Sequence, residues 1–272
     1  MNGRKRPTIE WTIEALGLCA VVLVAGRPGI AQEPDQQPPA QEPTASEAPA
    51  QQPPAQEPTP QQRIAALKAN LAASQSALKN YEWIETTTVS VKGEEKSRTE
   101  DQCYYDVTGT LQKVPVSQST APQRRPRGPF GRAPLRSEIA ESKKEGMEDY
   151  MKSAVALMQS YVPPDPSKLQ ALQQAGQMTI QPLEPGKTLR LTFSGYEKPG
   201  DSFAVDVDLT SNQILNVGIA SYLDSQNDPV TMQVKFGMLP GNISYASDIT
   251  LDAQAKNMTV TAQNTGYRST GS

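Results

Sequence analysis

The sequence contains no histidine in its 272 residues. This absence excludes Ser-His-Asp and Cys-His catalysis, and it excludes every zinc site that uses a histidine ligand. The sequence also lacks the GxGxxG pattern of dinucleotide-binding folds and the P-loop pattern. We therefore expect a protein that is not an enzyme, with no catalytic residues, no metal site and no cofactor.

Cysteine is almost as rare. The two cysteines are Cys19 and Cys103, and Cys19 lies in an N-terminal segment that we expect to be removed. The remaining chain then has no internal disulfide, so its stability must come from a hydrophobic core. We expect Cys103 to be partly buried and unpaired, because an exposed lone thiol favours covalent dimers in an oxidising compartment.

Long apolar runs are also missing, apart from one near the N-terminus. That run covers residues 13–25, contains Glu14 and is shorter than the roughly 20 residues that a transmembrane helix needs. It follows a basic cluster and precedes small residues, which is typical of a signal peptide over residues 1–31 with cleavage after Ala31. The alternative is an uncleaved N-terminal anchor. We expect a periplasmic or secreted protein whose mature chain has no transmembrane span.

Basic residues are absent from residues 32–60, which contain five acidic side chains and almost no large apolar ones. The nonamer QQPPAQEPT occurs there twice, at Gln36–Thr44 and at Gln51–Thr59. Such a segment cannot bury enough apolar surface to offset the entropy of ordering, so we expect a disordered linker. The alternative interpretation is a proline-rich ligand for a partner domain.

Charges balance in residues 61–272, which contain 22 basic and 22 acidic side chains. This balance argues against binding to nucleic acid. Within this region we expect a flexible loop rich in Arg, Pro and Gly at 119–137. Five arginines of this loop are candidates for contacts with anionic lipid headgroups, and the alternative is that they are simply solvated. They are Arg124, Arg125, Arg127, Arg132 and Arg136.

The spacing of apolar residues predicts the elements that follow the linker. Spacings of three and four predict helices at 61–80, from Ser137 to about Tyr161, and from Asp165 to about Gly176. Spacings of two predict antiparallel strands in 82–116 and after Met178. The expected fold class is α+β, with a curved, largely antiparallel β-sheet of about ten strands that forms an unclosed barrel. The N-terminal helix and two inserted helices lie against its apolar face, and residues 61–272 form a single domain.

One pair of carboxylates has a spacing that occurs in enzymes. Asp206 and Asp208 lie two residues apart in a predicted strand, about 7 Å from each other, which suits an inverting glycosidase. We expect both on the solvent-exposed face, where acidic pairs are usually only solvated. We therefore assign them no catalytic role.

The order of elements resembles the lipoprotein-carrier family, which comprises the LolA, LolB and RseB-like periplasmic proteins. In that family an unclosed barrel wraps helices and presents an apolar cavity. The resemblance covers roughly residues 61–268. The stretches YEWIETTTVSVKGEEKS and GMEDYMKSAVALMQSYVPPDP are also similar to a group of uncharacterised secreted bacterial proteins. The resemblance implies a binding protein of the cell envelope.

We therefore expect an exported, non-enzymatic protein that binds an apolar ligand, a lipid or an acylated chain, in a half-barrel cavity. Its partners would be a lipid or a lipoprotein. Candidate lining residues are large apolar or aromatic side chains on the buried faces. They are Trp83, Tyr150, Leu157, Phe193, Phe203 and Phe236. The alternative is an envelope protein-protein interaction or regulatory module with a closed core. A cavity of more than roughly a few hundred Å³ favours the ligand.

Overall fold

The computed structural model describes residues 60–120 and 134–271. Its helices are α1 (Pro60–Leu78), α2 (Pro134–Gln159) and α3 (Pro166–Gln174), with a 3₁₀ turn η1 at Gln254–Lys256. The predicted signal peptide, its cleavage site at Ala31 and nearly all of the predicted linker lie outside the described residues. So do Arg124, Arg125, Arg127 and Arg132. Arg136 lies in the first turn of α2, where the side chains are not described.

The described residues contain ten strands, numbered in chain order. The first three are β1 (Tyr81–Val91), β2 (Glu94–Tyr105) and β3 (Leu111–Thr120). The others are β4 (Met178–Glu184), β5 (Thr188–Ser194), β6 (Ser202–Asp208), β7 (Gln213–Tyr222), β8 (Pro229–Leu239), β9 (Ile243–Ala253) and β10 (Met258–Ser269).

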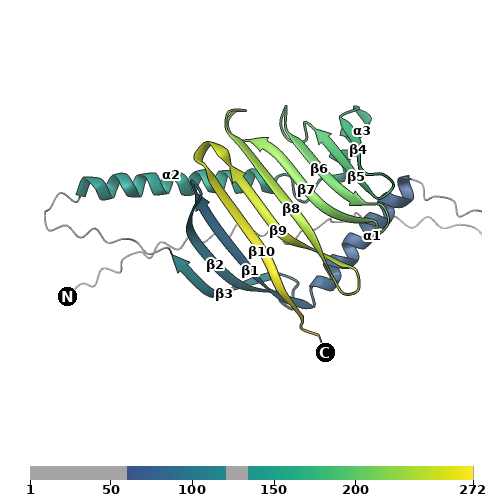
Figure 1. Ribbon diagram of the computed structural model, residues 1–272, viewed down its shortest axis with the longest axis horizontal. Coiled ribbons are helices and arrows are strands. Elements are labelled where there is room, and N and C mark those ends of the chain that lie inside the picture. The colour runs from purple at the N-terminus through teal and green to yellow at the C-terminus, as the bar shows by residue number, and fades with distance from the viewer. Residues whose placement is uncertain (1–59, 121–133, 272) are drawn as a thin grey trace, which may run out of the picture.

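The strands form one antiparallel sheet in the order β3-β2-β1-β10-β9-β8-β7-β6-β5-β4. All neighbours in the sheet are also neighbours in the sequence except β1 and β10, which pair over almost their whole length. The two outer strands, β3 and β4, are not paired with each other, so the curved sheet stays open (Figure 1). The predicted α+β class and the unclosed sheet of ten strands are therefore confirmed.

The core lies between one face of the sheet and the helices. Every second residue of β1 from Trp83 to Val91 is buried, as expected for a strand with one face against a core. Helix α2 contributes Met151, Val155 and Met158 to this core. In Figure 1, α2 passes behind the strands and α1 runs diagonally past the ends of several of them. Within the described residues, no helix is long and apolar enough to cross a membrane.

The helix starts show which local signals were strong. Asp165 caps α3, because its side chain accepts a hydrogen bond from Ser167 N (2.8 Å) and Pro166 occupies the first turn. Helix α2 begins at Pro134, three residues before the expected Ser137. Proline suits the first turn of a helix, since it has no N–H to leave unsatisfied there. The ends of the expected loop at 119–137 belong to regular elements, since β3 runs to Thr120 and α2 begins at Pro134, and residues 121–133 lie outside the described residues.

Each edge strand carries a proline whose nitrogen, which has no N–H, lies on the outer side of the strand. Ser194 N donates to Gln177 O (3.0 Å), and hydrogen-bonded pairs alternate along the strand, so Pro182 opposite Leu189 falls in a non-hydrogen-bonded pair. The missing N–H of Pro182 therefore lies on the outer side of β4. Between β2 and β3, Asp106 N donates to Thr110 O (2.9 Å), so Asp106 and Thr110 form a hydrogen-bonded pair. By the same alternation, Pro115 opposite Asp101 falls in a non-hydrogen-bonded pair, and its missing N–H lies on the outer side of β3. Both edges are thus poorly suited to pairing with another strand.

Candidate ligand-binding site

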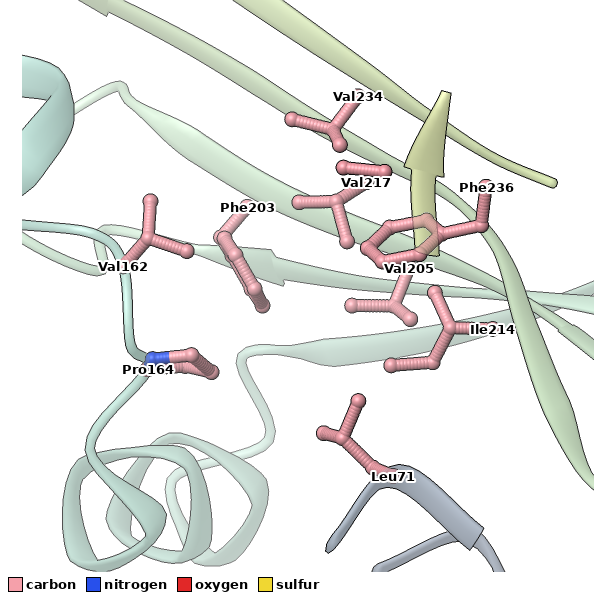
Figure 2. A pocket seen from close by; sticks show the side chains of 10 residues that line it. Leu71, Val162, Pro164, Phe203, Val205, Ile214, Val217, Val234 and Phe236 are labelled. Atoms are coloured by element: carbon pink, nitrogen blue, oxygen red, sulfur yellow. The ribbon is translucent and has the colours of Figure 1, made fainter. Parts of the chain in front are cut away.

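An apolar cavity of about 70 Å³ lies between the sheet, α1 and the segment that joins α2 to α3. Figure 2 shows the side chains that line it, nine of them labelled, and none of the ten lining side chains is polar. They are Leu71 of α1, Val162 and Pro164, Phe203 and Val205 of β6, Ile214 and Val217 of β7, Val234 and Phe236 of β8, and Ala246 of β9. The cavity can therefore hold only apolar groups without leaving polar atoms unpaired.

Helix α1 forms one wall of this cavity and is tied to the strand ends by two side chains. Asn70 Nδ2 lies 3.1 Å from the carbonyl oxygens of Ser211 and Asn212, in the turn between β6 and β7. Ser74 is buried, and its Oγ accepts a hydrogen bond from Ser244 N (3.0 Å) at the start of β9. These contacts fix the height of Leu71 above the sheet.

The opposite wall, Val162 and Pro164, is held by a buried carboxylate. Asp201 is 2% exposed and accepts hydrogen bonds from Tyr196 N (2.6 Å), Glu197 N (2.8 Å) and Lys198 N (2.7 Å). The hydroxyl of Tyr161, at the end of α2, also donates to Asp201. Burial raises the pKa of Tyr161, and the hydrogen bond to Asp201 raises it further. Because Tyr161 directly precedes Val162 in the chain, this network fixes the position of Val162 and Pro164.

At another place the sheet opens between β9 and β10. Their pairing ends at Asp248 and Gln263, although β9 extends beyond it with β8 and β10 extends beyond it with β1. Asn264 closes this split. It is 2% exposed, accepts from Trp83 Nε1 (3.0 Å) and donates from Nδ2 to Ala246 O (2.9 Å). Ala246 also lines the cavity, so the split and the cavity share a wall.

Replacing Asn264 by leucine should lower the free energy of unfolding by about 2–4 kcal/mol, because the Trp83 N–H and the Ala246 carbonyl each lose a buried partner. Urea denaturation measures this loss. Gln263→Leu is the matched control, since Gln263 is exposed on the other face of β10 and should cost less than about 0.5 kcal/mol. Equal effects of the two substitutions would contradict the role given to Asn264.

The inner face changes character beyond Trp83. Glu85 is buried and lies 2.5 Å from Lys113 Nζ, while Asp101 is paired with Glu85 across β1 and β2. Burial raises the pKa of Asp101; Lys113 opposes this rise and Glu85 adds to it. This end of the inner face is therefore polar, whereas the cavity end is apolar. In the part of the chain that the structure describes, no group of three or more acidic or cysteine side chains is placed to hold a metal ion.

The suspected carboxylate pair is engaged in structural contacts. Arg190 binds Asp206 through two hydrogen bonds (2.7 and 2.8 Å), and it covers Asp206 so that only 7% of this residue is exposed. Asp206 thus lies on the expected face, opposite the cavity-lining Phe203 and Val205, but it is covered by Arg190 instead of being solvated. Burial opposes the ionisation of Asp208, but hydrogen bonds from Thr210 N and Ser211 N hold its pKa below the usual value.

The structure distributes the six candidate lining residues over three places. Phe203 and Phe236 line the cavity. Phe193 packs against Phe203 (ring centroids 6.3 Å apart), and Leu157 and Tyr150 pack on the core from α2. Tyr150 also donates to Asp228 Oδ1 (2.5 Å). Trp83 lies outside the cavity lining and stacks on Tyr267 (5.3 Å). The sequence analysis did not single out Leu71 as a lining residue, although it lies in the predicted helix at 61–80.

No protein-family model matches the sequence, and no curated protein matches it either. The structure is similar to that of a LolA superfamily protein from Nitrosomonas europaea, with 8% identity and a TM-score of 0.31, over 74% of this chain and 92% of that one. A DUF1329 family protein from Desulfovibrio piger gives 7% identity and a TM-score of 0.31, over 76% and 92%. MucB in the MucA/MucB complex of Pseudomonas aeruginosa gives 10% and 0.21, over 77% and 100%. One of these structures is named for the LolA superfamily, which is part of the family that the element order resembles.

Proposed function

We propose that this protein is an exported, non-enzymatic binding protein that takes up an apolar ligand between α1 and the inner face of the sheet. The observation that carries this proposal is the cavity itself, whose ten lining side chains are all apolar. They come from α1, from four strands and from the α2–α3 connection, so the ligand would lie where several elements meet. Such convergent apolar sites are typical of small-molecule binding.

The size of the cavity sets a condition on this function. Its volume is about 70 Å³, whereas ligand sites usually measure roughly 300–1,000 Å³. A ligand larger than a few carbon atoms therefore requires a wall to move. Helix α1 is the wall that we propose moves, and among its described residues Asn70 and Ser74 hold it to the turn after β6 and to β9. Binding would lift α1 and place the ligand under Leu71.

Export is part of the same proposal and rests on the sequence of residues 1–31. A basic segment followed by a short apolar run directs proteins out of the cytoplasm. A lipid or an acylated chain of the envelope would then be available as the ligand. That the five arginines of the predicted loop contact the lipid headgroup remains a prediction.

Filling the cavity should abolish uptake of a ligand without unfolding the protein. Ala246 is half-buried in the cavity lining, so Ala246→Leu adds three carbon atoms to the space that the ligand needs. We expect the affinity for the fluorescent probe N-phenyl-1-naphthylamine to fall at least tenfold, about 1.4 kcal/mol, in an equilibrium titration. The control is Ala220→Leu, because Ala220 is exposed on the opposite face of β7 and should leave probe binding unchanged.

The second candidate function is an interaction module of the envelope. It is favoured by the small cavity, because buried apolar side chains fill much of the inner face around it. A partner would have to bind without adding a strand, since Pro115 and Pro182 remove donors from the two edges. If folded, lipid-free protein binds no probe in the titration above, this second function becomes the better one.

A further inference from the structure

The apolar cavity continues to the edge of the sheet along one row of side chains. Val217 pairs with Val205, Val205 with Leu191, and Leu191 with Ile180, so these four side chains lie side by side on the inner face from β7 to β4. Exposure rises along the row. Val217 is 7% exposed, Val205 and Leu191 are half-buried, and Ile180 is 56% exposed. The row thus leads from the cavity to solvent.

The neighbouring rows show where this path is covered. On one side, Phe193 and Phe203 are buried, and Phe203 packs against Tyr196. Lys168 of α3 places its Nζ over the ring of Tyr196. On the other side, Leu189 is half-buried and its partner Pro182 is exposed. Helix α1 packs mainly on β9 and β7, and α3 packs on β5. The open part of the row therefore lies between these two helices and ends at β4.

The apolar side chains of this row determine which kind of ligand can lie on it. Its side chains offer no hydrogen-bonding atom, so a peptide lying on it would bury its own N–H and C=O groups without partners. Strand addition at β4 does not remedy this, because Pro182 has no N–H to donate. An aliphatic chain has no such groups to satisfy. A carboxylate could not enter the apolar cavity either, so the methyl end must go in first.

The row also sets a length. Four strand spacings of about 4.8 Å separate Val234 on β8 from Ile180 on β4, which gives roughly 19 Å. An extended chain advances by roughly 1.2 Å per bond, so about 16 chain atoms span this distance. We propose that the ligand is one unbranched fatty acid of about this length, with its methyl end in the cavity and its carboxylate in solvent beside β4. This inference rests on the proposed function and adds the identity and direction of the ligand.

Calorimetric titration of the full chain with palmitate and with octanoate tests this path. Ile180→Glu places a charge beside the chain at the exposed end of the row, and we expect it to weaken palmitate binding at least tenfold. Octanoate should bind far more weakly than palmitate to the wild type and to both variants, because the carboxylate of a short chain would lie at Val205, in the apolar lining of the cavity. Thr179→Glu is the matched control, since Thr179 is exposed on the opposite face of the same strand. Both sites are exposed, so both variants should fold.

The outcomes separate the path from the proposed function. Palmitate binding that is equal in the wild type and both variants overturns the path and leaves an apolar site that does not include Ile180. No palmitate binding to the folded wild type overturns both. Photolabelled palmitate then tests the direction. A diazirine near the methyl end should cross-link to β7 and β8, and one near the carboxylate should cross-link to β4. The reverse pattern contradicts the proposed orientation.

Discussion

Replacing Asp201 by alanine should lower the free energy of unfolding by about 3–5 kcal/mol, because the acceptor is buried and four donors would lose it at once. Three of them are consecutive backbone N–H groups of the turn between β5 and β6, and the fourth is the hydroxyl of Tyr161. The effect should exceed that of an ordinary hydrogen bond, since four donors lose one shared acceptor and Tyr196 N lies in a buried site, while the Tyr161 hydroxyl keeps Ser221 Oγ (2.8 Å) as a partner. Chemical denaturation followed by circular dichroism measures it.

Asp208→Ala is the control for this substitution. Asp208 also accepts from two backbone N–H groups in a turn, but Thr210, one of the donors, is exposed and can bond to water instead. Its loss should cost about 1 kcal/mol. The Asp201 variant should also bind the naphthylamine probe more weakly at temperatures where it stays folded, because Tyr161 no longer fixes Val162 and Pro164. Equal stability losses in the two variants would contradict the central role of Asp201.

The fold class could be predicted because its signals are local. Alternating apolar residues in β6, β7 and β8 identify strands with one buried face, and the absence of helices after α3 indicates an antiparallel sheet. The prediction that a helix begins at Asp165 needed only a few neighbouring residues. The pairing of β1 with β10 was not visible in this way, since its partners lie more than 150 residues apart.

The site was harder to predict because its residues are selected by depth and distant contacts. Alternation showed that Phe193, Phe203 and Phe236 share a face, but not which of them lines a cavity. Trp83 has the same pattern and lies at the polar end of that face, beside Asn264. The role of Asn264 follows from the split between β9 and β10, which depends on where two strand pairings end. No local pattern in the sequence marks that point.

A disulfide between α1 and β9 should block ligand uptake reversibly. Ser74 Oγ lies 3.0 Å from Ser244 N, which places the two Cα atoms within about 7 Å of each other, so Ser74→Cys with Ser244→Cys can form the bond. It would close a loop of about 170 residues and fix α1 against the sheet, with about 4–5 kcal/mol of added stability. Cys103 is fully buried in β2 and should not compete for either new thiol.

The oxidised double variant should bind palmitate and the naphthylamine probe at least a hundredfold more weakly than its reduced form. The cavity of about 70 Å³ is too small for either molecule unless α1 moves, and the bond prevents that movement. Reduction should restore binding, and the single Ser74→Cys variant should bind equally well under both conditions. If the locked protein binds as tightly as the reduced one, the ligand does not lie beneath Leu71. The exposed row from Leu191 to Ile180 would then have to hold it without the cavity.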